Sequence, residues 1–281
     1  MDDEHPSGFM AFVNMTDTAR FRPVDTMRLT RATWFLFGHL TSTTDGCGLT
    51  WRSTSRPPGG KNTTGGETPT IRLNRLRTTG ARAGASIGGP HGTDPATTCE
   101  TQSRLTAAYR NTLSRWNLTH LDFEPTAIPS PTTTRKRARA VATLQKEFRA
   151  QQRPLWVSFT LPLTSSGLTP SHRATLKATR EAGARIDAVN LLIPLKSTGL
   201  QGTGHTIQRA VTHISTALAL DETTTRHHLA LTPVLTHSRD LTKSQAQTLA
   251  SYTHRHHQPW LSLRGPTPPP TVLQTLSDQP D

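Results

Sequence analysis

Two carboxylates stand two residues apart near the middle of the chain, where Asp122 and Glu124 lie in the apolar run LTHLDFE. If this run is a β-strand, its period of two places both side chains on one face, about 6.6 Å apart along the strand. Neighbouring carboxylates raise each other's pKa, and this spacing falls within the broad range that glycosidases use for acid–base chemistry. A second interpretation stays open, in which both groups are buried and paired with an arginine or with backbone amides.

Other chemistry-bearing residues form no specific arrangement. His91, His120 and His237 are candidate bases, yet the spacing assembles no serine–histidine–aspartate triad from them. Cys47 and Cys99 are too few and too far apart for a zinc site, so we expect neither a metal nor a cofactor. The two cysteines are either inert thiols or one disulfide worth roughly 4 kcal/mol, and a disulfide implies an exported protein.

The charge balance points to polyanions only weakly. The chain has 32 basic and 19 acidic residues, a formal charge of +13, but its arginines are spread along its length. The one run, Arg135 to Arg139, is typical of a solvated helix face, and no zinc-finger or helix-turn-helix spacing accompanies it. We therefore expect no nucleic-acid partner. No apolar run approaches the 18 residues of a membrane helix, and the acidic start of the chain does not resemble a signal peptide.

Short apolar runs rich in β-formers recur along the chain, and helical patterns separate them. The runs are 9–15, 33–40, 83–88, 118–124, 155–161, 186–193, 228–235 and 259–263. Helical periodicity appears around Ile71–Leu76, Leu105–Trp116 and Ala140–Phe148, and over 169–182, 206–220, 242–256 and 271–277.

Eight strands alternating with helices predict a single (β/α)₈ TIM barrel, an α/β fold. The alternative, a doubly wound open sheet, requires a glycine-rich turn after the first strand, and Asn14–Asp17 contains no glycine. We expect a disordered terminus over residues 1–8, the barrel over 9–265, and a short helix and tail over 266–281. Working residues of such barrels lie at the carboxyl ends of the strands. Asp122, Glu124, Asn190, His237 and Arg264 occupy such ends.

The chain resembles a known family along these same strands. Six stretches fall in order on the predicted strands and are similar to bacterial chitinases of glycoside hydrolase family 18, from about Phe12 to Leu263: GCGLTW (46–51), SIGGPHGT (86–93), LTHLDF (118–123), VSFTLP (157–162), AVN (188–190) and LTP (231–233). The resemblance implies the same barrel, a secreted protein and a disulfide between Cys47 and Cys99. It also implies a chitin-like glycan at the mouth of the barrel, with the following substrate-binding positions: Trp51, Gly88, Gly89, His91, Asn190 and Arg264.

Three positions depart from the family pattern. The family series Asp-x-x-Asp-x-Asp-x-Glu reads Thr119, Asp122, Glu124 and Thr126 here, so a threonine holds the general-acid position. After Asn190 the family's Asp and Tyr are absent, with Lys196 in place of the Tyr. Arg264 stands where the family has a tryptophan at the floor of the cleft.

We therefore expect a chitinase-like protein without an intact catalytic set that acts as a carbohydrate-binding or interaction scaffold. Glu124 lies about 7 Å deeper in the barrel than the family's acid by strand rise, so we do not expect it to replace that acid. General-acid assistance raises the rate of hydrolysis about 10²–10⁴-fold, so its loss nearly abolishes turnover. Two alternatives are a weakly active glycoside hydrolase that uses Asp122 and Glu124, and a polyanion-binding basic protein. We expect a monomer that is secreted and does not contact a membrane. The alternative location is the cytoplasm.

Overall fold

The structure is a computed structural model that describes residues 5–17, 20–43, 46–51, 67–90, 92–125, 130–195, 200 and 202–278. Eight parallel strands close into a barrel in this part of the chain, because β1 pairs with both β2 and β9. The alternative of an open sheet is thereby excluded. The strands of the barrel are β1 (Gly8–Asn14), β2 (Trp34–Ser42), β4 (Arg82–Gly88), β5 (His120–Glu124), β6 (Trp156–Pro162), β7 (Ala188–Pro194), β8 (Leu229–Val234) and β9 (Trp260–Ser262).

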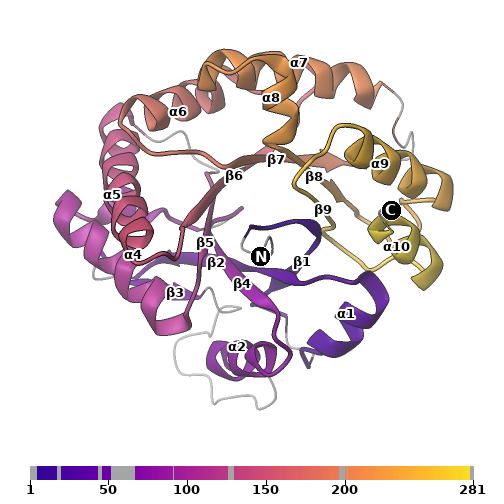
Figure 1. The fold of residues 1–281 in the computed structure, drawn as a ribbon, viewed down its shortest axis with the longest axis horizontal. Helices are drawn as coiled ribbons and strands as arrows, with labels where there is room; N and C mark the ends of the chain where they lie inside the picture. Colours follow the sequence, from indigo (N-terminus) through magenta and orange to yellow (C-terminus); the bar gives the residue numbers. More distant parts are fainter. Residues whose placement is uncertain are drawn as a thin grey trace.

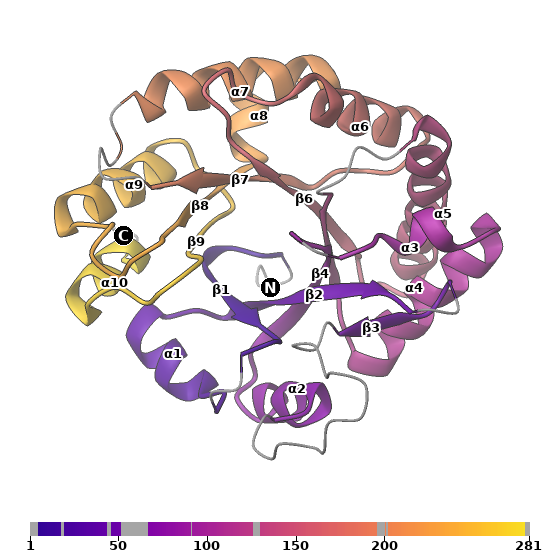
Figure 2. The ribbon, with the colours of Figure 1, turned by 180° about the vertical axis from the view of Figure 1, so that it is seen from behind.

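Helices form a ring around this barrel, seen from its two ends in Figures 1 and 2. The helices are α1 (Pro23–Thr30), α2 (Pro69–Arg77), α3 (Pro95–Thr98), α4 (Gln102–Trp116), α5 (Pro131–Ala150), α6 (Pro170–Glu181), α7 (Thr203–Leu218), α8 (Glu222–His227), α9 (Lys243–Arg255) and α10 (Pro270–Ser277). α10 packs against both α9 and α1, so the last helix joins the two ends of the ring. The prediction of a single (β/α)₈ barrel is confirmed.

Local sequence explains where several helices begin. The side-chain oxygens of Ser130, Thr169 and Thr242 each accept a hydrogen bond from a backbone N–H in the first turn of the helix that follows. Proline occupies the first position of α5 and α6, where its missing N–H costs nothing. These caps fix the starts of helices whose apolar faces then pack on the barrel.

The apolar core has two parts. The large part lies between the strands and the helices, and it includes outward-facing strand residues such as Phe35, Phe37, Phe123 and Phe159. The small part fills the barrel interior near the amino ends of the strands, with Met10, Leu36, Ala188 and Ala230 among two tryptophans, Trp34 and Trp260. Because strand side chains alternate, the interior above this plug is lined by the remaining inward residues, and most of these are polar.

A short antiparallel strand, β3 (Leu49–Trp51), extends β2 outside the barrel. It follows Cys47, whose sulfur is bonded to that of Cys99 just after α3. The disulfide that the family resemblance implied is therefore present. The terminal residues 1–4, which belong to the segment expected to be disordered, lie outside the described residues.

Candidate functional site

The strand β5 directs His120, Asp122 and Glu124 into the barrel, one above the other, and all three are buried. The alternation of side chains along a strand produces this column, as the sequence predicted. The two carboxylates differ sharply in their surroundings, and that difference decides what each can do.

Asp122 accepts three hydrogen bonds from hydroxyl groups. Ser86 Oγ and Ser158 Oγ donate at 2.6 Å, and Thr160 Oγ1 donates at 2.9 Å. Burial raises the pKa of Asp122 above its ordinary value, and the hydrogen bonds from Ser158 and Ser86 offset part of that rise. Asp122 is thus the acceptor at the centre of a hydroxyl cluster contributed by β4 and β6.

Asn190 extends this cluster towards β8. Its Nδ2 donates to Thr160 Oγ1 at 3.1 Å, and its Oδ1 accepts from Thr232 Oγ1 at 2.8 Å. The side chain is buried. Since both ends of the amide are engaged with neighbouring strands, Asn190 serves to hold the interior network together.

Glu124 sits at the carboxyl end of β5 between two basic side chains. Arg264 Nη1 lies 2.5 Å and His39 Nε2 lies 2.9 Å from the same carboxylate oxygen, Oε2. Burial alone would raise the pKa of Glu124, but the hydrogen bond from His39 and the charge of Arg264 outweigh it, so the pKa lies below its ordinary value. Glu124 is therefore ionised at neutral pH, and its Oε2 is paired with both basic side chains.

His39 reaches Glu124 because β2 is irregular at this point. The register between β2 and β4 shifts between Gly38 and Leu40, and a bulge of this kind re-aims a side chain. On the other side, Gly89 has φ +75°, and a Cβ there would lie 2.4 Å from His39 Cγ. The absence of a side chain at Gly89 thus leaves room for the imidazole.

Gly88 has a related role at the end of β4. Its φ is +99°, and a Cβ would lie 2.6 Å from the carbonyl oxygen of Glu124. That same oxygen accepts a hydrogen bond from the Gly89 N–H at 2.9 Å. The two glycines, expected as substrate-binding residues, allow the end of β4 to lie directly against the end of β5.

Arg264 follows β9 and is tied to the end of β8. Its N–H donates to the carbonyl of Pro233 at 3.0 Å, and its own carbonyl accepts from the Leu235 N–H at 2.9 Å. The guanidinium carbon lies 4.0 Å from the centre of the Phe12 ring. Arg264 Nη2 is buried and has no hydrogen-bond partner among the described residues. Arg264 therefore covers Phe12 and also contacts Glu124.

The remaining predicted residues lie elsewhere. Trp51 is buried on the helix-facing side of the barrel, 5.1 Å from the Trp116 ring and 6.3 Å from the Phe37 ring, which corrects the expectation that it lines the mouth. His237 is exposed beside Asp240, away from the two carboxylates. His91, Thr126 and Lys196 lie outside the described residues.

Sequence reasoning missed His39 and the hydroxyl groups around Asp122. Ser86, Ser158, Thr160 and Thr232 could have been found, because each sits at an inward position of a strand that was correctly located. His39 could not, because regular alternation from Trp34 and Leu36 points it outward, and it turns inward where the register of β2 becomes irregular.

The described residues provide neither a metal site nor a membrane helix. They contain no group of three or more His, Cys, Asp or Glu side chains that could hold a metal ion. They also include no helix both long enough and apolar enough to cross a membrane. What the site offers is a buried carboxylate–guanidinium–imidazole cluster above a network of hydroxyl groups around Asp122.

Similarity to known sequences covers part of the chain. A 123-residue stretch, 43% of this chain, is 27% identical to a probable bifunctional chitinase/lysozyme of Escherichia coli and, in a second comparison, 27% identical to endochitinase 11 of Metarhizium anisopliae. The matches span 14% and 24% of the lengths of those two proteins. No protein-family model matches the chain.

Similarity to solved structures covers nearly all of the chain. The catalytic domain of a Pyrococcus furiosus chitinase superposes with a TM-score of 0.77 at 18% identity, over 97% of this chain and 94% of that one. A GH18 chitinase from Pseudoalteromonas aurantia gives 0.60 at 10% identity, over 92% and 93%. A chitinase-like agglutinin from Robinia pseudoacacia gives 0.63 at 11% identity, over 95% and 98%.

These solved structures share the barrel, and the two curated sequences connect part of it to chitinases. Over 43% of its length this chain is similar in sequence to two chitinases, and over nearly all of its length its barrel superposes on the barrels of chitinases and of a chitinase-like agglutinin.

Proposed function

We propose that this protein binds chitin-like glycans at the mouth of its barrel and does not hydrolyse them. The observation that carries the proposal is the pairing of Glu124 with Arg264 and His39. Cleavage of a glycosidic bond requires a carboxylic acid that protonates the leaving oxygen. Glu124 has a lowered pKa and is ionised at neutral pH, so it lacks the proton that this step needs.

Asp122 does not replace it. Its two oxygens already accept hydrogen bonds from the hydroxyl groups of Ser86, Ser158 and Thr160, and the residue is not exposed to solvent. A glycosidic oxygen could approach only if this cluster came apart. At the position where the family has its acid the sequence has Thr126, whose hydroxyl does not donate a proton at neutral pH.

Binding is supported by the proteins that this chain resembles and by the place of Arg264 at the carboxyl ends of the strands, beside the paired Glu124. Arg264 Nη2 is buried and has no hydrogen-bond partner among the described residues, so a sugar hydroxyl reaches it only when neighbouring side chains move. Related proteins agree with a carbohydrate ligand, since the Pyrococcus furiosus chitinase has been crystallised with chito-oligosaccharides. The same barrel also occurs in a chitinase-like agglutinin, a name that describes a binding protein.

Titration calorimetry with chitotetraose and chitohexaose tests binding directly. We expect saturable heat that decreases in the variant Arg264→Ala and is unchanged in Arg139→Ala, which removes an exposed arginine of α5. An absence of both heat and saturation with either oligosaccharide would overturn the proposal.

A fluorogenic chitobioside assay separates binding from hydrolysis. We expect no turnover above the uncatalysed rate. Turnover that is abolished in Glu124→Gln and retained in Glu181→Gln, an exposed carboxylate of α6, would instead establish the weakly active hydrolase. The unfolding curves of both variants serve as the control for folding.

We also propose that the chain works in an oxidising compartment, as secretion would provide. The support is the disulfide between Cys47 and Cys99, since such bonds persist outside reducing compartments. Alkylation of the protein in freshly lysed source cells, without reductant, should leave both cysteines unmodified. Modification of both cysteines would contradict the proposal.

A further inference from the structure

A second concave site lies at the end of the barrel opposite to the mouth. It has a volume of about 470 Å³ and is formed where α2 leads into β4, α4 into β5 and α5 into β6. These connections all lie at the amino ends of the strands, whereas Glu124 and Arg264 lie at the carboxyl ends. The cavity is therefore separate from the proposed glycan site.

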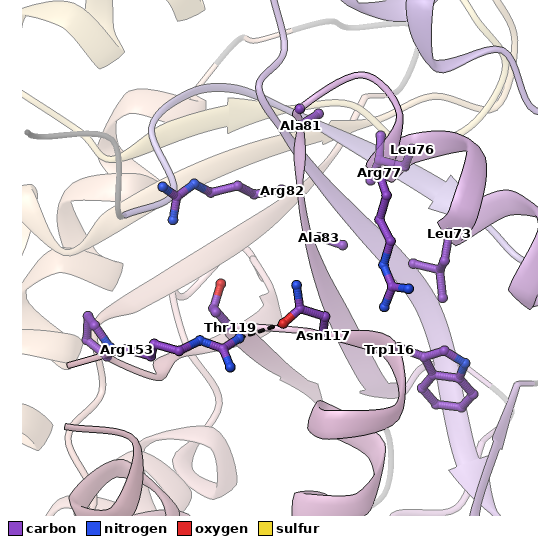
Figure 3. A pocket seen from close by; sticks show the side chains of 12 residues that line it. Leu73, Leu76, Arg77, Ala81, Arg82, Ala83, Trp116, Asn117, Thr119 and Arg153 are labelled. Atoms are coloured by element: carbon purple, nitrogen blue, oxygen red, sulfur yellow. Dashed lines mark hydrogen bonds between the residues drawn. The ribbon is translucent and has the colours of Figure 1, made fainter. Parts of the chain in front are cut away.

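Three arginines from three different segments line this cavity. Arg77 ends α2, Arg82 begins β4, and Arg153 lies in the connection before β6, as Figure 3 shows. None of the 12 lining residues is acidic. Three guanidinium groups around one concavity create a positive potential that favours an anion carrying more than one charge.

The contacts of these arginines leave their charges uncompensated. Arg153 Nη2 donates to Asn117 Oδ1 at 2.6 Å, Arg77 Nη1 donates to Asn74 Oδ1 at 3.4 Å, and the Arg82 guanidinium lies 5.7 Å from the centre of the Trp34 ring. Each partner is neutral, and no carboxylate of the described residues forms an ion pair with any of the three. Elsewhere the chain does pair its arginines, as in Arg110–Glu147.

One wall of the cavity is apolar. Leu73 and Leu76 of α2 and Trp116 of α4 are buried side chains that line it, together with Ala83 of β4. Figure 3 shows Arg77 extending along this wall, while Thr119 and Asn117 lie between it and Arg153. A ligand that fills the cavity therefore needs an anionic end and an uncharged, planar or apolar end.

We propose that this cavity binds a small organic phosphate. Its phosphate lies among Arg77, Arg82 and Arg153, whose planar guanidinium groups match phosphate oxygens in pairs. Its uncharged part lies against Leu73, Leu76 and Trp116. Because the cavity is distant from the mouth, this site stands independently of glycan binding.

Calorimetry at low ionic strength with adenosine monophosphate as the probe tests the site. We expect saturable binding that is tighter than that of inorganic phosphate, and none with adenosine, since the phosphate supplies the charge and the ring supplies the apolar contact. Failure of adenosine monophosphate to bind, or binding no tighter than that of inorganic phosphate, would overturn the proposal.

Two variants with a matched control locate the binding. Arg77→Gln and Arg153→Gln, both at exposed positions, should each weaken binding of adenosine monophosphate roughly tenfold or more, the effect of losing one charge-assisted contact. Arg139→Gln, which removes the same charge from the exposed face of α5, should leave it unchanged. An equal loss in all three variants would assign the binding to net charge, as for a general polyanion binder, and would overturn the proposed site.

Discussion

Arg264 and Glu124 form a buried ion pair, with 11% and 6% of their side chains exposed. Removing one partner from such a pair leaves a charge away from water, which costs up to about 3–5 kcal/mol. Since the hydrogen bond between His39 and Glu124 remains, we expect Arg264→Met to lower the free energy of unfolding in urea denaturation by no more than that amount. Arg264→Met combined with Glu124→Gln should recover most of the loss, because the buried charge is then gone. A double variant as unstable as the single one would contradict this account.

His120 makes the stability depend on pH. Burial among Trp34, Trp260 and Ser158 lowers its pKa from 6.5 to about 3. Between these two values the unfolded chain binds a proton that the folded chain does not, so the free energy of unfolding decreases as the pH falls. Each pH unit in this window costs up to about 1.4 kcal/mol.

The variant His120→Gln isolates that contribution, since an amide can still donate to Ser158 Oγ. We expect urea unfolding between pH 6.5 and 4.5 to depend less on pH in His120→Gln than in the wild type. His172, His213 and His256 also have lowered pKa values and remain in both proteins, so they cancel in the difference. His237→Gln, at an exposed position, is the control. Equal pH dependence in wild type and His120→Gln would refute the role of His120.

For single residues, the sequence could predict towards which face a side chain points, but not which residue it contacts. Alternation placed Asp122 and Glu124 inward, and the alternative of a buried carboxylate paired with an arginine is what the structure has for Glu124. The identity of the partner was out of reach, because Arg264 is 140 residues away and the pairing depends on closure of the barrel. Trp51 was misplaced because the sequence does not reveal β3, which turns its ring towards α4.

At the level of elements, the join between β4 and β5 depends on glycine. Gly89 has a φ of +75°, and a Cβ added there would lie 2.4 Å from Cγ of the His39 ring. Gly80 has nearly the same φ, +78°, but a Cβ there would meet nothing within 4 Å. The two positions therefore share backbone strain and differ only in the clash.

We expect Gly80→Ala to lower the free energy of unfolding by about 1–2 kcal/mol, the cost of the left-handed conformation. Gly89→Ala should lower it further, because the new methyl group displaces His39 and breaks its hydrogen bond to Glu124, a contact worth about 1.5–3 kcal/mol. Urea denaturation of both variants measures the difference. Equal losses of unfolding free energy in the two variants would show that His39 can move aside without destabilising the protein.

The elements that could be predicted were those with long apolar patterns. All eight barrel strands and seven of the helices coincide with predicted runs, because burial on both faces of a parallel strand leaves a clear apolar signal. The missed elements are short or weakly apolar: α1 buries only Pro23 and Thr30, α3 has four residues, α8 has six, and β3 has three. Their structure comes from packing on the finished barrel, which local sequence does not encode.

In the molecule as a whole, the two ends of the barrel have different electrostatics. At the carboxyl ends of the strands the positive charge of Arg264 is matched by Glu124, whereas three arginines at the amino ends have no carboxylate partner among the described residues. The pairing of Arg264 with Glu124 fits the uncharged glycan that we propose at the mouth, and the unmatched arginines fit the anion that we propose at the opposite end.

The disulfide acts on the whole chain, because it closes a loop between residues 52 positions apart. Cys99 is buried at the end of α3, and Cys47 precedes β3, so the bond ties the β2–β3 region to the helix layer. In the chain-entropy account, a cross-link of this length restricts the unfolded ensemble and stabilises the fold by about 4 kcal/mol.

We expect Cys47→Ala with Cys99→Ala to lower the free energy of unfolding by about 4 kcal/mol, measured by urea denaturation. Reduced wild-type protein should lose nearly as much, since it too lacks the cross-link while keeping both side chains. A large loss on reduction but not in the alanine variant would show that buried thiols, rather than the missing cross-link, destabilise the protein. The barrel itself should survive in both, because the eight-strand closure through β1, β2 and β9 involves neither cysteine.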